Sequence, residues 1–336
     1  MRLNYDALQR YGSVLDFWQS TCNYNGSSAC SRGRCCNPET NEYQKRCDEL
    51  WSEWHKAGGK GKAPVMPSPT VECEKCEYAD LTVGAFQGNA SLRTISRHTE
   101  GVIPVPLKGH KKVWLDNVDR KQLDGVLNDI DTDIEAFAIT GSPKIESFAF
   151  LERFSGLKYV YLWWNNKATS LWDFTKTPNV EFLRLDAFNR LSDISQIEKA
   201  KKLRYLKLYA GNESIDSLKP LERHPSLEVV SLWRKVDDAD LSALMSIPKL
   251  KYLDCHFNIF DIDAYAAFEA IRPDMDTSFW EGLHCYEYDR PNENNSYYVG
   301  LAGKRQGIAE ANNTAKQEKH RLKYLSVKRK YSATEI

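Results

Sequence analysis

The sequence predicts an α/β solenoid, in which short strands alternate with short helical segments in about seven units of 23 or 24 residues over residues 110–272. Two observations predict this class. A strand-like motif recurs at a nearly constant interval, and a second apolar motif recurs between its copies. A small cysteine-rich helical module is expected before the repeats, and a cap with a basic tail is expected after them.

The strand motif carries apolar residues at its first, fourth and sixth positions. Its seven copies begin at His110, Ile134, Leu157, Val180, Leu203, Leu227 and Leu250, and the copy at His110 is weaker because its first residue is not apolar. Successive copies are 23 or 24 residues apart. One unit cannot bury its apolar side alone and gains stability by stacking on its neighbours. The alternative is an ordinary α/β domain with evenly spaced strands, but connection lengths in such domains scatter by several residues.

The second half of each unit carries apolar residues three apart, a spacing that predicts a short 3₁₀ or α turn. Four such triplets are Leu191, Ile194 and Ile197; Ile215, Leu218 and Leu221; Leu241, Leu244 and Ile247; and Ile262, Tyr265 and Phe268. Pro178, Pro225 and Pro248 lie just before the next strand, where a helix must stop.

These motifs resemble those of the leucine-rich repeat family, in particular its short-repeat, internalin-like class, over about half the chain. The family places Asn at the ninth position of the unit, where its side chain bonds neighbouring backbone. Asn165 and Asn258 match this position, whereas Phe188, Gly211 and Lys235 depart from it, so we expect irregular turns there. The resemblance also suggests an immunity-like or effector-like role in a bacterium or phage.

Side-chain alternation sends the third, fifth and seventh positions of the strand motif to the concave face. Exposed aromatic surface costs hydration unless something covers it, and Tyr, Trp and Arg are enriched at interface hot spots. The sequence therefore predicts recognition of a protein partner through this face. The candidate contact residues are Trp114, Tyr159, Tyr161, Trp163, Phe182, Arg184, Tyr205, Lys207, Tyr209, Trp233, Tyr252 and His256.

A competing interpretation is that the aromatic side chains stack on one another along the strands, or that a terminal segment of the chain covers them. A nucleic acid is a poor ligand for this face, because Arg184 and Lys207 are interspersed with Asp116, Asp186 and Asp254.

The amino-terminal region divides into a helical cysteine-rich module over residues 1–63 and a linker with an N-terminal cap over residues 64–109. Seven of the nine cysteines precede residue 77. Cys73 and Cys76 have the spacing of half a zinc site, and Cys35 and Cys47 are candidates to complete it. Unliganded thiols and a disulfide-linked extracellular module are the alternatives.

An alternative function places the chemistry in residues 20–76, as a zinc-dependent nucleic-acid binder or a cysteine or metal enzyme docked by the repeats. Cys35 or Cys36 with His55 or His98 would supply a nucleophile and a base. Because no serine elbow, phosphate-cradling loop or paired metal-binding histidine motif occurs in the sequence, we expect a protein that is not an enzyme.

Aromatic, turn-rich residues 273–300 predict a cap, and residues 301–336 predict a basic, mostly helical tail. We interpret the tail as a solvated, partly frayed helix, with contact to nucleic acid or an acidic partner as the alternative. The 46 basic and 46 acidic residues cancel, so any charge-driven partner must act locally. No apolar run predicts a signal peptide or membrane span, and we expect a cytoplasmic protein without membrane contact.

Overall fold

The computed structural model divides by its internal contacts into two compact regions, Met1–Arg93 and Thr94–Ile336. The structure describes residues 108–109, 111–116, 120–238, 240–286, 298–310 and 313–332, which all belong to the second region. The predicted cysteine-rich module and all but the last two residues of the predicted linker lie outside the described residues.

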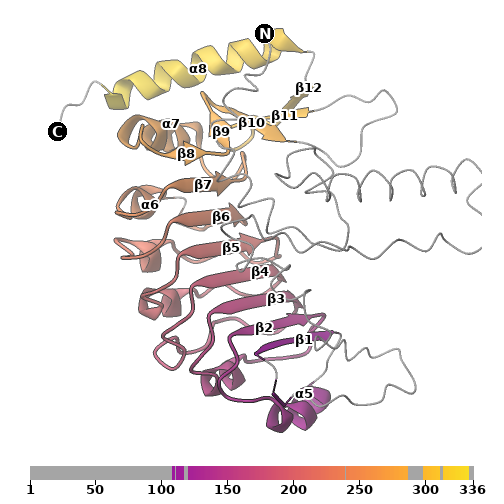
Figure 1. Ribbon diagram of the computed structural model, residues 1–336. Coiled ribbons are helices and arrows are strands. Elements are labelled where there is room, and N and C mark those ends of the chain that lie inside the picture. Colours follow the sequence, from indigo (N-terminus) through magenta and orange to yellow (C-terminus); the bar gives the residue numbers. More distant parts are fainter. Residues whose placement is uncertain are drawn as a thin grey trace, which may run out of the picture. The chain divides into compact units, whose positions relative to one another are not determined.

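An eight-stranded parallel sheet organises the described part of the chain, with its strands in chain order (Figure 1). Its strands are β1 (Lys112–Asp116), β2 (Ala136–Thr140), β3 (Tyr159–Asn165), β4 (Phe182–Phe188), β5 (Tyr205–Tyr209), β6 (Val229–Trp233), β7 (Tyr252–Cys255) and β8 (Asp276–Thr277). Paired residues on neighbouring strands are 23 or 24 positions apart, as in Tyr159 with Phe182 and Tyr205 with Val229. The predicted α/β character is confirmed.

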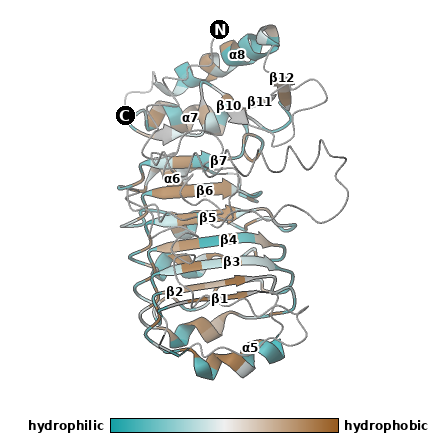
Figure 2. Ribbon diagram, turned by 45° about the vertical axis from the view of Figure 1, so that its right-hand side comes forward, coloured by the Kyte–Doolittle hydropathy of each residue, from teal (hydrophilic) through white to brown (hydrophobic). Residues whose placement is uncertain are grey.

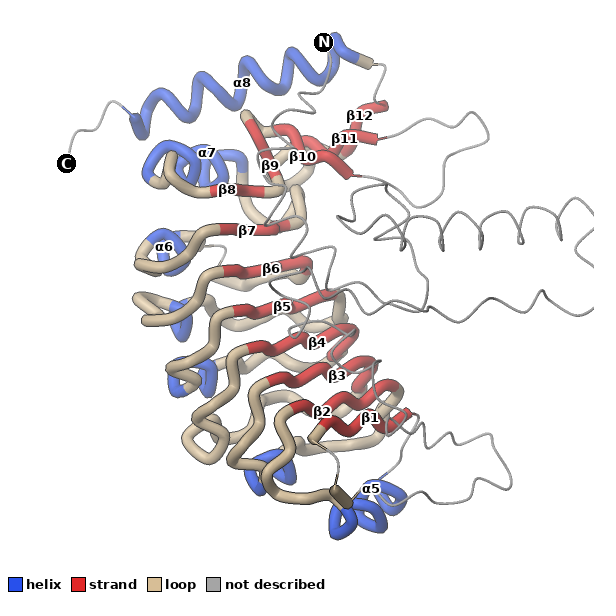
Figure 3. Tube along the Cα trace, viewed as in Figure 1, coloured by secondary structure: helices blue, strands red, loops and turns tan. Residues whose placement is uncertain are grey.

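Short helices lie along one side of the strands (Figure 3). They are α5 (Arg120–Val126), η2 (Leu127–Asp129), η3 (Ala149–Arg153), η4 (Ser195–Lys199), η5 (Lys219–Leu221), α6 (Ser242–Met245) and α7 (Ile262–Ile271). The apolar triplets fall in or next to the last four of these segments, which confirms the predicted helical turns. A helical segment lies in each connection between β1 and β8 except the one between β3 and β4, where residues 166–181 form turns instead.

The apolar positions of the strand motif form the core, which Figure 2 shows as brown bands along the strands. Val160, Leu162, Leu183 and Leu185 are at most 1% exposed. Burying one such side chain contributes about 1.5–3 kcal/mol relative to leaving it in water. Because each strand from β1 to β7 adds side chains of this kind to one continuous cluster, these strands stabilise one another.

A left-handed backbone conformation recurs where the chain leaves successive strands. It is adopted by Gly141, Trp164, Ala187 and Ala210, with φ of 75°, 61°, 54° and 56°. These four residues are each 23 positions apart. The same turn therefore repeats at one position of the unit, although three of the four residues there carry a Cβ that disfavours it.

Asn165 supports this turn with its buried side chain. Its Nδ2 donates to the carbonyl oxygens of Ser142 and Ile145 in the preceding unit, at 2.7 and 2.8 Å. Its Oδ1 accepts from the backbone N–H groups of Lys167 and Ala168. All the hydrogen-bonding groups of the amide are thus used to join two adjacent units.

Arg234 supports the turns of the next two units, where Phe188 and Gly211 replace asparagine. Its buried guanidinium donates to the carbonyl oxygens of Phe188 and Leu191, both at 2.5 Å, and to that of Glu213 at 2.8 Å. Burial lowers the pKa of Arg234 to about 10, against the raising effect of Glu213. The turns expected to be irregular are therefore stabilised by an arginine from a later unit.

The carboxyl-terminal segment closes the end of the parallel sheet. Four antiparallel strands, β9 (Phe279–Trp280), β10 (Leu283–Tyr286), β11 (Tyr298–Leu301) and β12 (Ile308–Glu310), form a second sheet, and α8 (Thr314–Ser332) follows. The parallel sheet continues to β8, beyond residue 272 where the repeats were expected to end. The antiparallel sheet and α8 then occupy the place of the predicted cap.

Helix α8 packs beside α7 (Figure 1), with Gln317, His320, Tyr324 and Val327 on its buried face. It is helical as predicted, but it is docked rather than frayed. None of the helices in the described ranges, α8 included, combines the length and the apolar character that crossing a membrane requires.

Candidate functional site

The predicted contact residues lie on one surface of the sheet, which we call the strand face and define by the third, fifth and seventh positions of the strand motif. Residues at the same position pair in register from strand to strand. Tyr161 is beside Arg184, and Arg184 is beside Lys207. The sheet therefore brings the predicted contact residues together in rows across the strands. The side chain of Trp114 lies outside the described part of the chain.

Solvent exposure was expected for this face, and that expectation is wrong at most third and fifth positions. Exposed fractions are 5% for Tyr161, 2% for Phe182, 7% for Arg184, 0% for Tyr205 and 4% for Tyr252. Tyr159, Lys207, Trp233 and His256 are half-buried. Large side chains on strands about 4.8 Å apart contact one another and exclude water from their shared surfaces.

Aromatic stacking accounts for part of this burial. The rings of Phe182 and Tyr205 are parallel to within 10°, with centroids 4.3 Å apart. The rings of Tyr209 and Trp233 also lie together, with centroids 5.9 Å apart. This agrees with the competing interpretation, in which aromatic side chains stack along the ladder, for the residues in the middle of the face.

A charged network lies on β3 and β4. The Arg184 guanidinium donates from Nε and Nη2 to Oδ2 of Asp186, at 2.8 and 2.5 Å, and it lies 4.7 Å from the ring centre of Tyr161. Burial alone would lower the pKa of Arg184, but the Asp186 carboxylate outweighs it and raises the pKa. Burial raises the pKa of the Tyr161 hydroxyl. Arginine and tyrosine are both held in their protonated forms.

Lys207 sits next to this network on β5. Its ammonium is 5.3 Å from the ring centre of Tyr209. Desolvation, together with the positive charge of Arg184 on the neighbouring strand, lowers the pKa of Lys207 to about 8. The Lys207 ammonium therefore loses its proton more readily than an ordinary lysine does.

The far end of the strand face is built around Asp254. Its Oδ2 accepts from the hydroxyl of Ser231 at 2.8 Å and from the indole N–H of Trp233 at 2.6 Å. Burial raises the pKa of Asp254 despite these bonds. The Trp233 ring also contacts the rings of His256 and His284, at 5.0 and 5.8 Å. This end is a closed hydrogen-bonded and aromatic cluster.

Two seventh-position aromatics remain open to solvent. Trp163 on β3 is 47% exposed and Tyr209 on β5 is 42% exposed. Asp186 on β4 is the register partner of both. The Oδ1 atom of Asp186 is buried without a hydrogen-bond partner in the part of the chain that the structure describes. An acceptor therefore lies between two exposed rings whose strands are about 10 Å apart.

Trp164 is a third exposed aromatic, at 44%, and the sequence prediction missed it. It follows Trp163 directly and adopts the left-handed conformation, with φ of 61°. The equivalent positions hold Gly141, Ala187 and Ala210. The sequence does hold a signal for Trp164, because it is a tryptophan where the equivalent positions carry Gly or Ala. Using this signal requires knowing that this position is the turn.

The predicted zinc ligands Cys35, Cys47, Cys73 and Cys76 lie outside the described residues, so zinc stays a prediction. Within the described ranges, no cluster of three or more His, Cys, Asp or Glu side chains could hold a metal ion. Cys255 is fully buried, and burial raises the pKa of its thiol, which disfavours the reactive thiolate.

Neither a known protein family nor a characterised protein matches this sequence.

Proposed function

We propose that this chain is a leucine-rich repeat protein that recognises a protein partner through its strand face. Three features support the repeat class: the constant interval between paired strands, the recurrent left-handed turn, and the asparagine of Asn165 that joins two units. In such an architecture the strand side is a continuous surface across all units, suited to an extended contact.

The observation that carries the binding proposal is the group of three exposed aromatics, Trp163, Trp164 and Tyr209, which we call the aromatic edge. Exposing large apolar groups to water is unfavourable, and a partner that covers them on binding gains that free energy. Trp and Tyr are also the residues most enriched among interface hot spots. We therefore place the energetic centre of the interface at the aromatic edge.

Trp164 gives this argument its strongest step. The unit needs a left-handed turn at this position, and alanine or glycine satisfies the turn in the other units. A left-handed conformation costs a residue with a Cβ about 1–2 kcal/mol. The turn does not require an indole, yet Trp164 exposes one to solvent. An exposed aromatic side chain at a strained backbone position is typical of a binding site.

Asp186 supplies the polar part of the contact. A buried carboxylate oxygen without a donor costs about 1–3 kcal/mol. Because Oδ1 of Asp186 is shielded from solvent, a partner's N–H or O–H group would recover this cost by displacing the side chains that cover it. The buried residues of the strand face, including the stacked rings and the Arg184 ion pair, hold Trp163, Tyr209 and the Asp186 carboxylate in place.

The test is affinity capture from the native host with the full chain, followed by identification and purification of the captured protein. Trp163→Ala with Tyr209→Ala, and separately Trp164→Ala, should each weaken binding of the purified partner by at least tenfold, since hot-spot residues contribute about 2 kcal/mol or more. Melting temperatures should stay within a few degrees of the parent.

Leu322→Ala is the matched control, because Leu322 is 58% exposed and lies on α8, away from the strand face. Binding that survives in both aromatic variants, or is lost equally in the control, would contradict the proposal.

A further inference from the structure

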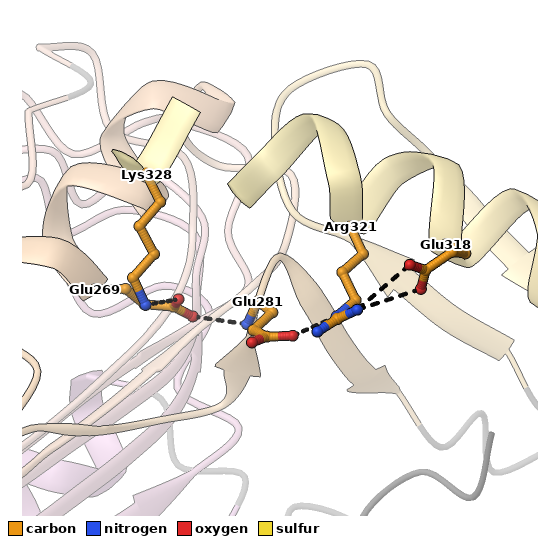
Figure 4. A network of polar contacts seen from close by, with 5 residues as sticks. All are labelled: Glu269, Glu281, Glu318, Arg321 and Lys328. Carbon is orange, nitrogen blue, oxygen red and sulfur yellow. Dashed lines mark hydrogen bonds and ion pairs between the residues drawn. The ribbon is translucent and has the colours of Figure 1, made fainter. Parts of the chain in front are cut away.

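Helix α8 is fixed at the end of the parallel sheet by ion pairs that span long stretches of chain (Figure 4). Lys328 contacts the buried carboxylate of Glu269 on α7 at 3.0 Å, and Arg321 bonds both Glu281 and Glu318. These pairs use two of the basic residues of α8 and its only acidic one. These pairs, with the buried residues of α8, fix which side of the helix faces α7.

The opposite face of α8 is exposed and basic. The exposed residues of α8 are Thr314, Ala315, Lys316, Lys319, Leu322, Lys323, Ser326, Arg329, Lys330 and Ser332. We call the cations of this set, with Lys304 and Arg305, the basic face. Because the charge of the whole chain sums to zero, this concentration of positive charge is a local feature and not a property of the composition.

The loop between β11 and β12 extends the basic face beyond the helix. Lys316 donates from Nζ to the carbonyl oxygen of Ile308 at 2.7 Å, and Lys323 donates to Oε1 of Gln306 at 3.3 Å. Lys304 and Arg305, both exposed, lie in this same loop. The cations of the helix and of the loop therefore form one surface.

We infer that the basic face binds the phosphate backbone of duplex nucleic acid. Lys316, Lys319, Lys323 and Lys330 follow one side of the helix over about 21 Å, at about 1.5 Å per residue. A duplex presents about six phosphates per strand over that length. The spacing and the number of cations fit a polyanion with charges along a line.

Other anionic partners fit this face less well. Single strands are usually held by stacking on exposed aromatics, but Tyr324 is buried and Tyr331 is half-buried beside Asp263. An anionic membrane requires an apolar stripe beside the cations, whereas the exposed apolar residues here form none: Ala315 and Leu322 are two turns apart on α8, and Ile308 lies on β12. Lysine contacts to phosphate carry no sequence information, so binding is expected to be independent of sequence.

The experiment measures binding of the full chain to a labelled 20-base-pair duplex by fluorescence anisotropy between 50 and 200 mM salt. Each phosphate contact contributes about −0.9 to the slope of log affinity against log salt. We expect a slope of about −4 to −6. Replacing Lys316, Lys319, Lys323 and Lys330 together by Gln should reduce its magnitude by about 3 to 4 and weaken binding at least 100-fold at 50 mM salt.

The matched control replaces four exposed lysines of the repeats, Lys167, Lys176, Lys201 and Lys219, by Gln and should keep the parent slope. Circular dichroism and thermal melting check that both variants fold. No duplex binding at 50 mM salt, an unchanged slope in the α8 variant, or tighter binding of a single strand, polyglutamate or anionic vesicles at equal salt would overturn the inference. Because the aromatic edge is not involved, this outcome is independent of the proposed protein partner.

Discussion

The guanidinium of Arg234 fills the space that a side chain at Gly211 would need. A Cβ built on Gly211 would lie 2.3 Å from Nη1 of Arg234, and the φ of Gly211 is 132°. From this position the guanidinium reaches the carbonyl oxygens of two preceding units. One glycine and one arginine, 23 positions apart, thus stabilise turns that lack the expected asparagine.

Gly211→Ala is expected to destabilise the fold by about 2–3 kcal/mol, because it displaces the guanidinium and strains the backbone. Chemical denaturation measures the change. Gly125→Ala is the matched control: no atom lies within 4 Å of the added Cβ, and Gly125 is in helix α5, where alanine is favoured by about 1 kcal/mol. Equal effects at the two glycines would contradict the role given to Arg234.

Arg234→Met is expected to cost about 2–4 kcal/mol, because several buried carbonyl oxygens lose their donors. Arg190→Met is the control, since Arg190 is exposed, and it should change stability by less than about 0.5 kcal/mol. Unfolding midpoints in urea measure both. A loss in Arg234→Met no larger than in the control would show that the turns do not depend on the guanidinium.

The strands were predictable from the sequence because their apolar residues repeat at an interval that few folds share. The pairing of Val160 with Leu183 follows from that interval alone. Arg234 was not predictable, since its contact to Phe188 joins residues 46 positions apart and does not recur from unit to unit. The docking of α8 escaped prediction for a similar reason, because Lys328 and Glu269 are 59 positions apart.

Side-chain direction on the strand face was predictable, but exposure was not. Alternation places Tyr205 and Tyr209 on the same face, yet one is fully buried and the other 42% exposed. Stacking with Phe182 depends on the identity of the neighbour in the next unit. The aromatic edge was therefore only partly identified, and Trp164 was missed because alternation does not apply at a left-handed turn.

Tyr205→Ala and Tyr209→Ala should separate core from surface on one strand. Tyr205→Ala is expected to cost about 3–5 kcal/mol, as for other buried aromatic truncations. Tyr209→Ala should cost less than about 1 kcal/mol, since nearly half of its side chain is in water. Thermal and urea unfolding measure both, and similar losses would contradict the difference in burial.

The ion pair of Lys328 with Glu269 should behave as a buried pair, because the Glu269 side chain is only 9% exposed. Burial raises the pKa of Glu269, and Lys328 opposes this effect. Lys328→Met leaves the carboxylate without a cation and is expected to cost about 3 kcal/mol. Adding Glu269→Gln should restore most of the loss. Hydrogen exchange of α8 amides measures the local effect, and a double variant less stable than Lys328→Met would argue against the pairing.

Acid is expected to destabilise the fold through its buried histidines. Burial lowers the pKa of His224 to about 4 and that of His284 to about 3. An unfolded histidine binds a proton below about pH 6.5, so the unfolded chain holds more protons than the folded one between pH 6.5 and 4. The contribution of these two histidines to stability is therefore full above pH 6.5 and falls as the pH falls through this window.

His284→Phe removes one of these protonation differences. Between pH 6 and 5, the unfolding free energy of the parent should fall more steeply than that of the variant, by about 1 kcal/mol per pH unit. Comparing the two proteins cancels the opposite effect of Asp254 and Glu269, whose pKa values burial raises. Between pH 7 and 8 the two curves should run parallel, because histidine is neutral in both states. Parallel curves between pH 6 and 5 as well would mean that His284 gains its proton in the folded protein, which its position beside Trp233 and Phe257 is expected to prevent.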